Sequence, residues 1–70
     1  MTLHQVGGGR TVLIVAVDAP EKERKRLESI GVVPGVEVGI LADNGGPILV
    51  AIGESRLAIE RDLAGMVQVV

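Results

Sequence analysis

One stretch of this chain, residues 18–31, has the pattern of a helix, and the apolar segments around it are short and separated by turn residues. Short runs that are rich in Val and Ile are typical of strands, because a branched Cβ suits a pleated surface. Five such runs lie at residues 10–17, 36–41, 47–52, 56–60 and 66–70. The sequence therefore predicts an all-β domain of about five strands, with one short helix between the first strand and the second.

The helical stretch carries signals for both of its ends. Asp18 is placed to cap the helix, with Glu21 three residues later in a capping-box arrangement and Pro20 in the first turn. Glu21 and Lys25 are four residues apart and form a favourable pair on one helix face. Gly31 supplies the left-handed residue that commonly ends a helix. These signals predict a helix of about three turns.

The predicted strands and turns follow from local patterns. Residues 10–17 are apolar almost throughout, which indicates either burial on both faces or a central position in a curled sheet. Pro34 and Gly35 predict a tight turn that leads into a strand of alternating pattern. Asn44 and Gly45 both tolerate a positive φ, so they predict a hairpin turn.

A chain of 70 residues provides one domain, residues 1–70. Five short strands joined by tight turns must protect their edges, and a closed or nearly closed barrel is the usual solution in a small domain. The helix would cover one end of this barrel, with Leu27 and Ile30 as its inward face. Hydrophobic residues make up 47% of the chain, and none is aromatic. We therefore expect an aliphatic core and an apolar surface left over for self-association or for a partner.

No arrangement of residues indicates catalysis or tight metal binding. His4 is the only histidine and cysteine is absent, whereas a metal site needs several convergent ligands. Residues 22–26 are basic, but glutamates alternate with them and the net charge is −2, so nucleic acid is not an expected partner. Residues 22–26 are either a solvated helix face or a docking patch for an acidic protein. The longest apolar run, residues 12–17, is too short to cross a bilayer and no secretory signal is visible, so the expected location is the cytoplasm.

The order of these features resembles the FeoA family of ferrous iron uptake accessory proteins. The most diagnostic segment runs from Arg26 and Leu27 at the helix end, through residues 30–35, to Val36 and Val38. The matching residues on either side are Leu3, Val6, Gly9, Pro47, Ile48, Ile52, Gly53, residues 57–61, Ala64, Val67 and Val69. The similarity covers nearly the whole chain, and the ordered set of residues carries it rather than any single piece.

The resemblance implies an SH3-like β-barrel in a small cytoplasmic protein that assists or regulates FeoB, the membrane ferrous iron transporter with a cytoplasmic GTP-binding domain. It implies no catalytic residues and no cofactor, and it leaves a homo-oligomer open. The alternative is a module that binds or senses a divalent metal, akin to the accessory domain of DtxR-type repressors. Such a module would bind metal weakly here, because the sequence shows no ligand set.

Two sets of residues are expected to matter most. Two adjacent valines beside a helix end cannot both be fully inside, so one of them is an expected apolar contact point beside the basic helix face. The candidate partner-binding residues are Lys22, Arg24, Lys25, Arg26, Val32 and Val33. The turns expected to define the fold are at Gly31, Pro34, Gly35, Asn44 and Gly45.

Overall fold

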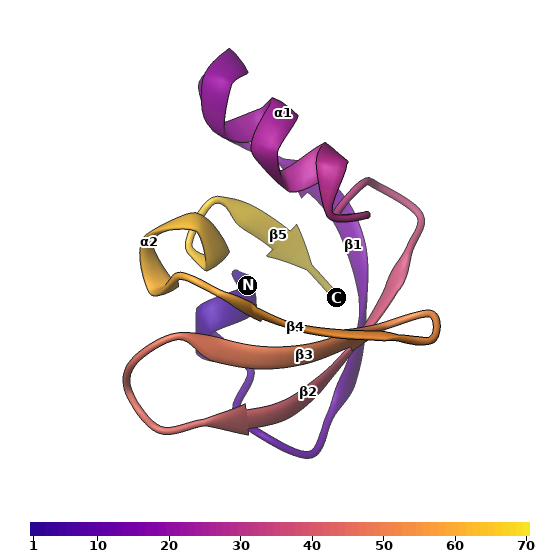
Figure 1. Ribbon diagram of the computed structural model, residues 1–70, viewed down its shortest axis with the longest axis vertical. Helices are drawn as coiled ribbons and strands as arrows, with labels where there is room; N and C mark the ends of the chain where they lie inside the picture. The colour runs from indigo at the N-terminus through magenta and orange to yellow at the C-terminus, as the bar shows by residue number, and fades with distance from the viewer.

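The computed structural model describes all 70 residues and contains five strands, one nine-residue α-helix and two shorter helical segments (Figure 1). In chain order the elements are the 3-10 helix η1 (Leu3–Gln5), β1 (Thr11–Val17), α1 (Glu21–Ser29), β2 (Glu37–Asp43), β3 (Ile48–Ile52), β4 (Ser55–Ile59), α2 (Arg61–Ala64) and β5 (Val67–Val69). The prediction of a mostly β domain with five strands and a short helix is confirmed.

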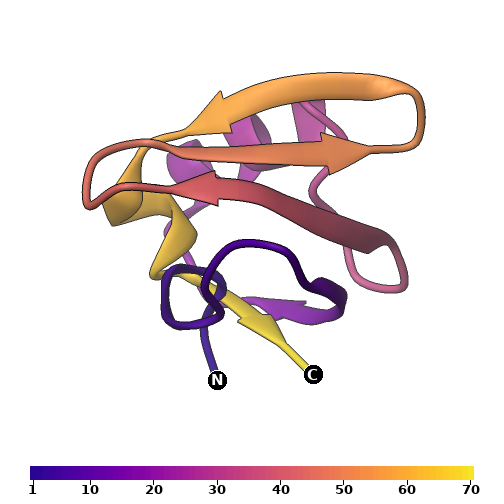
Figure 2. The same cartoon turned by 90° about the horizontal axis from the view of Figure 1, so that it is seen from below.

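The five strands form one antiparallel sheet in the order β4-β3-β2-β1-β5, and β4 and β5 do not pair with each other. Of the two forms predicted, a closed or a nearly closed barrel, the closed one is therefore wrong. The sheet curls instead, with β2, β3 and β4 on one side and β1 and β5 on the other (Figure 2). The register shifts between Ile14 and Ala16 of β1 and between Ile40 and Ala42 of β2. Such bulges bend a strand and increase its twist, which brings the two halves of the sheet to face each other.

The core lies inside this curl and consists of 15 aliphatic residues. β1 contributes Val12 and Ile14, while Leu13 and Val15 between and beyond them are 39% and 47% exposed. The prediction that β1 is buried on both faces is wrong, because only the inner side of a single curled sheet is covered. The alternative of a central position holds only in part, since β1 is an interior strand between β2 and β5, but β2 is the middle strand of the sheet.

The N-cap of α1 lies two residues later than the predicted cap. Pro20 is the N-cap residue, and no side chain makes a capping hydrogen bond. The expectation that Asp18 caps the helix is wrong, because Asp18 lies two residues before the N-cap, where its amide donates to the carbonyl oxygen of Met66 at 2.7 Å. Asp18 thus still belongs to the sheet region, and Pro20, with its fixed φ, starts the helix.

Two glycines with positive φ turn the chain from α1 into β2. Gly31 has a φ of 91° and its amide donates to the Glu28 carbonyl at 3.0 Å, while the amide of Val32 donates to the Leu27 carbonyl at 2.9 Å. These two bonds are those of a Schellman motif. Gly35 has a φ of 92° after Pro34, which is the geometry of a type II turn.

The β2–β3 hairpin has a four-residue loop at residues 44–47, because Asp43 pairs directly with Ile48. The hairpin turn predicted from Asn44 and Gly45 is present, and of the two residues only Gly45 has a positive φ, of 94°. The amide of Gly45 donates to the Asp43 carboxylate at 3.1 Å, so a side chain shapes this loop.

The outer edge of β5 is covered by the N-terminal segment. The amide of Val69 donates to the Met1 carbonyl at 2.8 Å, and Thr2 forms an isolated bridge with Gln68. Leu3 is buried in the core, so this segment is held by packing as well as by backbone hydrogen bonds. No strand pairs with the outer edge of β4, which leaves it as the one unpaired edge of the sheet.

Candidate protein-binding surface

The helix α1 stands at one end of the molecule (Figure 1) and contributes only Leu27 to the core. Leu27 is its only buried residue, and the other eight positions are exposed or half-buried. A helix held by one buried side chain presents most of its surface to solvent. The charged side chains of α1 are therefore mostly exposed to solvent and are not packed against the rest of the protein.

The four predicted basic residues do not form one patch. At about 100° per residue, Lys22, Lys25 and Arg26 fall on one arc of the helix, and Arg24 lies nearly opposite Lys22. Lys25 pairs with Glu21 at 3.4 Å, as their spacing predicts. Arg24 donates from Nη2 to the Ala19 carbonyl at 3.1 Å, which turns it towards the start of the helix.

The two adjacent valines after α1 have different environments. Val32 is fully buried in the core, so its side chain is not available to a partner, and its expected role as a contact residue is wrong. Val33 is half-buried and keeps part of its surface in solvent. The Schellman motif explains the difference, because it directs the residue after Gly31 back onto the helix and into the core.

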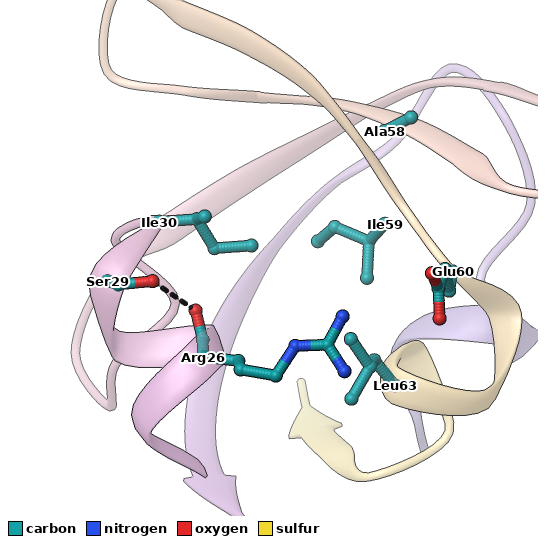
Figure 3. A pocket seen from close by; sticks show the side chains of 7 residues that line it. All are labelled: Arg26, Ser29, Ile30, Ala58, Ile59, Glu60 and Leu63. Carbon is teal, nitrogen blue, oxygen red and sulfur yellow. Dashed lines mark hydrogen bonds between the residues drawn. The ribbon is translucent and has the colours of Figure 1, made fainter. Parts of the chain in front are cut away.

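A groove of about 240 Å³ separates the end of α1 from β4 and α2 (Figure 3). We call it the β4 groove. The Arg26 side chain reaches across it from α1 towards Leu63 of α2 (Figure 3). Its lining residues are Arg26, Ser29, Ile30, Ala58, Ile59, Glu60 and Leu63.

A second groove, of about 380 Å³, lies on the other flank of α1, and we call it the β1 groove. Arg24 and Glu28 border it from the helix and Pro34 from the turn that follows. Its remaining lining residues are Val15, Ala16, Val17 and Val32. The structure thus assigns Arg24 and Arg26 to two different grooves.

The sequence patterns miss most of the β4 groove. Ile30 was expected on the inward face of α1 but is 39% exposed, because the helix ends there and its side chain lies along the groove. Ala58, Glu60 and Leu63 are about thirty residues away along the chain, and no local pattern links them to α1. The one signal in the sequence is that a helical turn, α2, directly follows the short strand β4, so the end of β4 lies beside α2.

A second feature without a local signal is a polar network around Arg61. Arg61 forms an ion pair with Asp43 and donates from Nε to the Gly45 carbonyl at 3.0 Å. This network fixes the β2–β3 loop against α2. It serves the fold, because its groups are mutually paired and none faces a groove.

The ionisable residues do not gather into a metal centre. No group of three or more His, Cys, Asp or Glu side chains converges anywhere in the chain. The Nδ1 atom of His4 lies 2.8 Å from the Thr2 hydroxyl oxygen, and the ring lies beside Gly65. No helix is both long enough and apolar enough to span a lipid bilayer.

Comparisons with known proteins place this fold. The FeoA domain profile matches residues 1–70. The crystal structure of an iron uptake regulatory protein (FeoA) is 33% identical, with a TM-score of 0.94 over 99% of this chain and 93% of that chain. The *Stenotrophomonas maltophilia* FeoA in complex with zinc is 30% identical, with a TM-score of 0.88 over 100% of this chain and 89% of that chain.

The fold is also similar to part of a transcriptional repressor. A manganese-dependent transcriptional repressor is 25% identical, with a TM-score of 0.89, but this chain covers only 40% of its length. A comparison with curated protein sequences finds no match.

The curled five-stranded sheet with an exposed helix defines a small β domain similar to the *S. maltophilia* protein, which is described as a procaryotic SH3 domain protein. The profile match over the full length shows that the chain belongs to the FeoA family, which is associated with ferrous iron transport. The family is an accessory transport-factor domain and is not a known family of enzymes.

Proposed function

We propose that this protein is a cytoplasmic accessory factor of ferrous iron uptake that acts by contact with the cytoplasmic part of an FeoB-type transporter. The observation that carries the proposal is the FeoA match over residues 1–70. The *S. maltophilia* relative has been proposed to act as a ferrous iron transport activating factor, which agrees with an accessory role.

The surface that fits this role is the exposed arc of α1 together with Val33. Lys22 and Arg26 take part in neither of the two ion pairs of the protein, so their charges are available to an acidic partner. Complementary charge raises the association rate and sets the orientation of a complex. Val33 adds an exposed apolar contact beside the same helix end.

The test is the affinity of the purified protein for the purified cytoplasmic domain of the transporter, measured by biolayer interferometry. We expect Arg26→Glu and Val33→Asp each to weaken binding about ten-fold or more. Arg10→Glu is the matched control, because Arg10 is also exposed but lines neither groove. If all three variants bind like the parent, the contact surface lies elsewhere, and if the parent does not bind, the partnership itself is wrong.

A second candidate function is the binding or sensing of a divalent metal. It is favoured by the likeness to a manganese-dependent repressor and to a FeoA crystallised with zinc. The absence of a group of three ligand side chains makes a tight site in one copy hard to build. Anaerobic calorimetric titration with Fe²⁺, Mn²⁺ and Zn²⁺ tests this candidate, and no heat at millimolar metal would rule it out.

A further inference from the structure

The two edges of the open sheet are treated differently. The N-terminal segment covers the outer edge of β5 through the Met1–Val69 hydrogen bond and the Thr2–Gln68 bridge. The outer edge of β4 has no partner strand, no bulge and no proline. Natural proteins normally protect such an edge, because a free row of amide and carbonyl groups is a template for another strand. The unprotected edge of β4 is therefore a candidate site for pairing with a further strand.

The register of the β3–β4 hairpin identifies the free backbone groups. Ile52 pairs with Ser55 across a two-residue turn, so this pair exchanges both hydrogen bonds and the bonded pairs then alternate along the strand. The amide and carbonyl groups of Arg56 and Ala58 consequently point to the open edge. Neither residue takes part in the backbone hydrogen bonds that run outside the helices and strands, and both are exposed.

The β4 groove lies directly beside this edge. It is bounded by Ala58 on the strand, Ile30 at the end of α1 and Leu63 on α2 (Figure 3). Its volume of about 240 Å³ is below the range of about 300–1,000 Å³ that is typical of small-molecule pockets. A groove of this size, partly apolar and next to free backbone groups, suits one large aliphatic side chain of an added strand.

The charges around the groove favour an acidic occupant over a second copy of this chain. Arg26 crosses the groove and forms no ion pair, and Arg56 is an exposed base on β4 itself. Two copies joined through β4 would bring these like charges together, whereas a carboxylate on a foreign strand would offset them. Glu60 is the one acid that lines the groove, and it lies at the α2 end and does not pair with Arg26.

We propose that β4 binds an extended acidic peptide as a sixth strand of the sheet. The peptide backbone pairs with Arg56 and Ala58, one large aliphatic side chain fills the β4 groove, and a carboxylate on the same face pairs with Arg26. This inference does not depend on the transporter partnership, because it follows from the free edge, the groove and the charges beside them.

The probe for this proposal is the heptapeptide acetyl-Thr-Glu-Thr-Leu-Thr-Glu-Thr-amide, in which Leu and both Glu residues share one strand face. Titration into the full-length protein is followed by amide NMR and hydrogen exchange. We expect the amides of Arg56 and Ala58 to exchange fast in the free protein and to become protected on binding. Replacing the peptide Leu with Ala, or both Glu with Lys, is expected to weaken binding about ten-fold.

Two peptides N-methylated at alternate residues test the backbone pairing without any change to the protein. A strand that pairs through one edge uses only every second amide, so we expect one of these peptides to lose binding and the other to retain it. Equal binding of both would show that the peptide does not add as a strand, and the proposal would be wrong.

Ala58→Pro removes one of the two free donors of β4 and keeps the bonds to β3, since proline is tolerated on an edge strand. We expect it to abolish peptide binding, while Leu49→Ser, on the outer face of the interior strand β3, leaves binding unchanged. If millimolar peptide leaves the Arg56 and Ala58 amides of the parent protein unprotected, the proposal is overturned. Protection of these amides that rises with protein concentration alone would assign the edge to a second copy and would also overturn it.

Discussion

Arg61, the first residue of α2, forms an ion pair with Asp43, the last residue of β2, and the two side chains are 32% and 13% exposed. Asp43 also accepts a hydrogen bond from the amide of Gly45, whose carbonyl accepts one from Arg61. A single arginine from outside the β2–β3 hairpin therefore pairs with two groups of its loop region, the Asp43 carboxylate and the Gly45 carbonyl. This contact joins segments that are 18 positions apart and fixes α2 beside the sheet.

We predict that Arg61→Ala lowers the free energy of unfolding by about 1.5–3 kcal/mol, because it leaves the largely buried Asp43 carboxylate without its charged partner. In a domain of this size that loss corresponds to a fall in melting temperature of about 4–8 °C per kcal/mol. Urea unfolding followed by circular dichroism measures the change.

The matched control is Lys25→Ala, which removes the partner of Glu21 in the other ion pair. Those side chains are 72% and 80% exposed, so water and salt screen the pair and the change should stay below about 0.5 kcal/mol. A cost for Arg61→Ala no larger than that for Lys25→Ala would contradict the structural role of the Arg61 network.

Features that depend on a few neighbouring residues could be predicted from the sequence. Gly31 and Gly35 can adopt a positive φ, and Pro34 between them has a fixed φ. The turns between α1 and β2 could therefore be predicted from these three residues. The pairing of Glu21 with Lys25 was visible for the same reason. The prediction of an Asp18 cap was wrong because the N-cap is Pro20, and the hydrogen bond from the Asp18 amide to Met66, before the helix, joins residues far apart in the chain.

Features that depend on the curl of the sheet could not be predicted. Whether β4 meets β5 depends on bulges in β1 and β2, which no residue pattern marks. The β4 groove exists because the sheet stays open and α1 ends beside the gap, so Ile30 and Leu63 come together only in three dimensions. The basic residues 22–26 could be recognised from the sequence. Leu27 is the residue that anchors the helix to the core, and this orientation directs Arg24 and Arg26 to different grooves.

We predict that Gly31→Ala and Gly35→Ala each lower the free energy of unfolding by about 1–2 kcal/mol. Both glycines have φ near 91°, where a Cβ clashes with the backbone. A Cβ on Gly31 would meet only Ile52 Cγ2, at 3.5 Å, and one on Gly35 would meet nothing within 4 Å. The cost is therefore conformational, and chemical denaturation should give similar values at the two positions.

Gly46→Ala provides the control for these two variants. Gly46 has no positive φ, and an added Cβ would meet nothing within 4 Å. We expect its unfolding free energy to stay within about 0.5 kcal/mol of the parent or to rise slightly, since alanine restricts the unfolded chain. A loss at Gly46 equal to that at Gly31 would mean that lost chain flexibility, and not left-handed geometry, sets the cost.

The two adjacent valines are predicted to contribute differently to the stability of the fold. Val32→Ala should cost about 2 kcal/mol, because Val32 is fully buried and its shortening leaves a cavity. Val33→Ala should cost less than about 1 kcal/mol, because Val33 keeps part of its surface in solvent. Melting curves of the two variants measure this difference, and equal costs would show that Val33 is as much a core residue as Val32.

The N-terminal segment is predicted to be part of the fold and not a lead-in to it. Leu3 is fully buried, so Leu3→Ala should cost about 3 kcal/mol, whereas Met1→Ala should cost less than about 0.5 kcal/mol because Met1 is 60% exposed. Loosening this segment also uncovers the edge of β5, so Leu3→Ala should speed hydrogen exchange at the Val69 amide, which donates to the Met1 carbonyl. Urea unfolding and amide exchange measure the two effects. If Leu3→Ala left both unchanged, the segment would not be packed as described and β5 would be a second open edge, able to compete with β4 for an added strand.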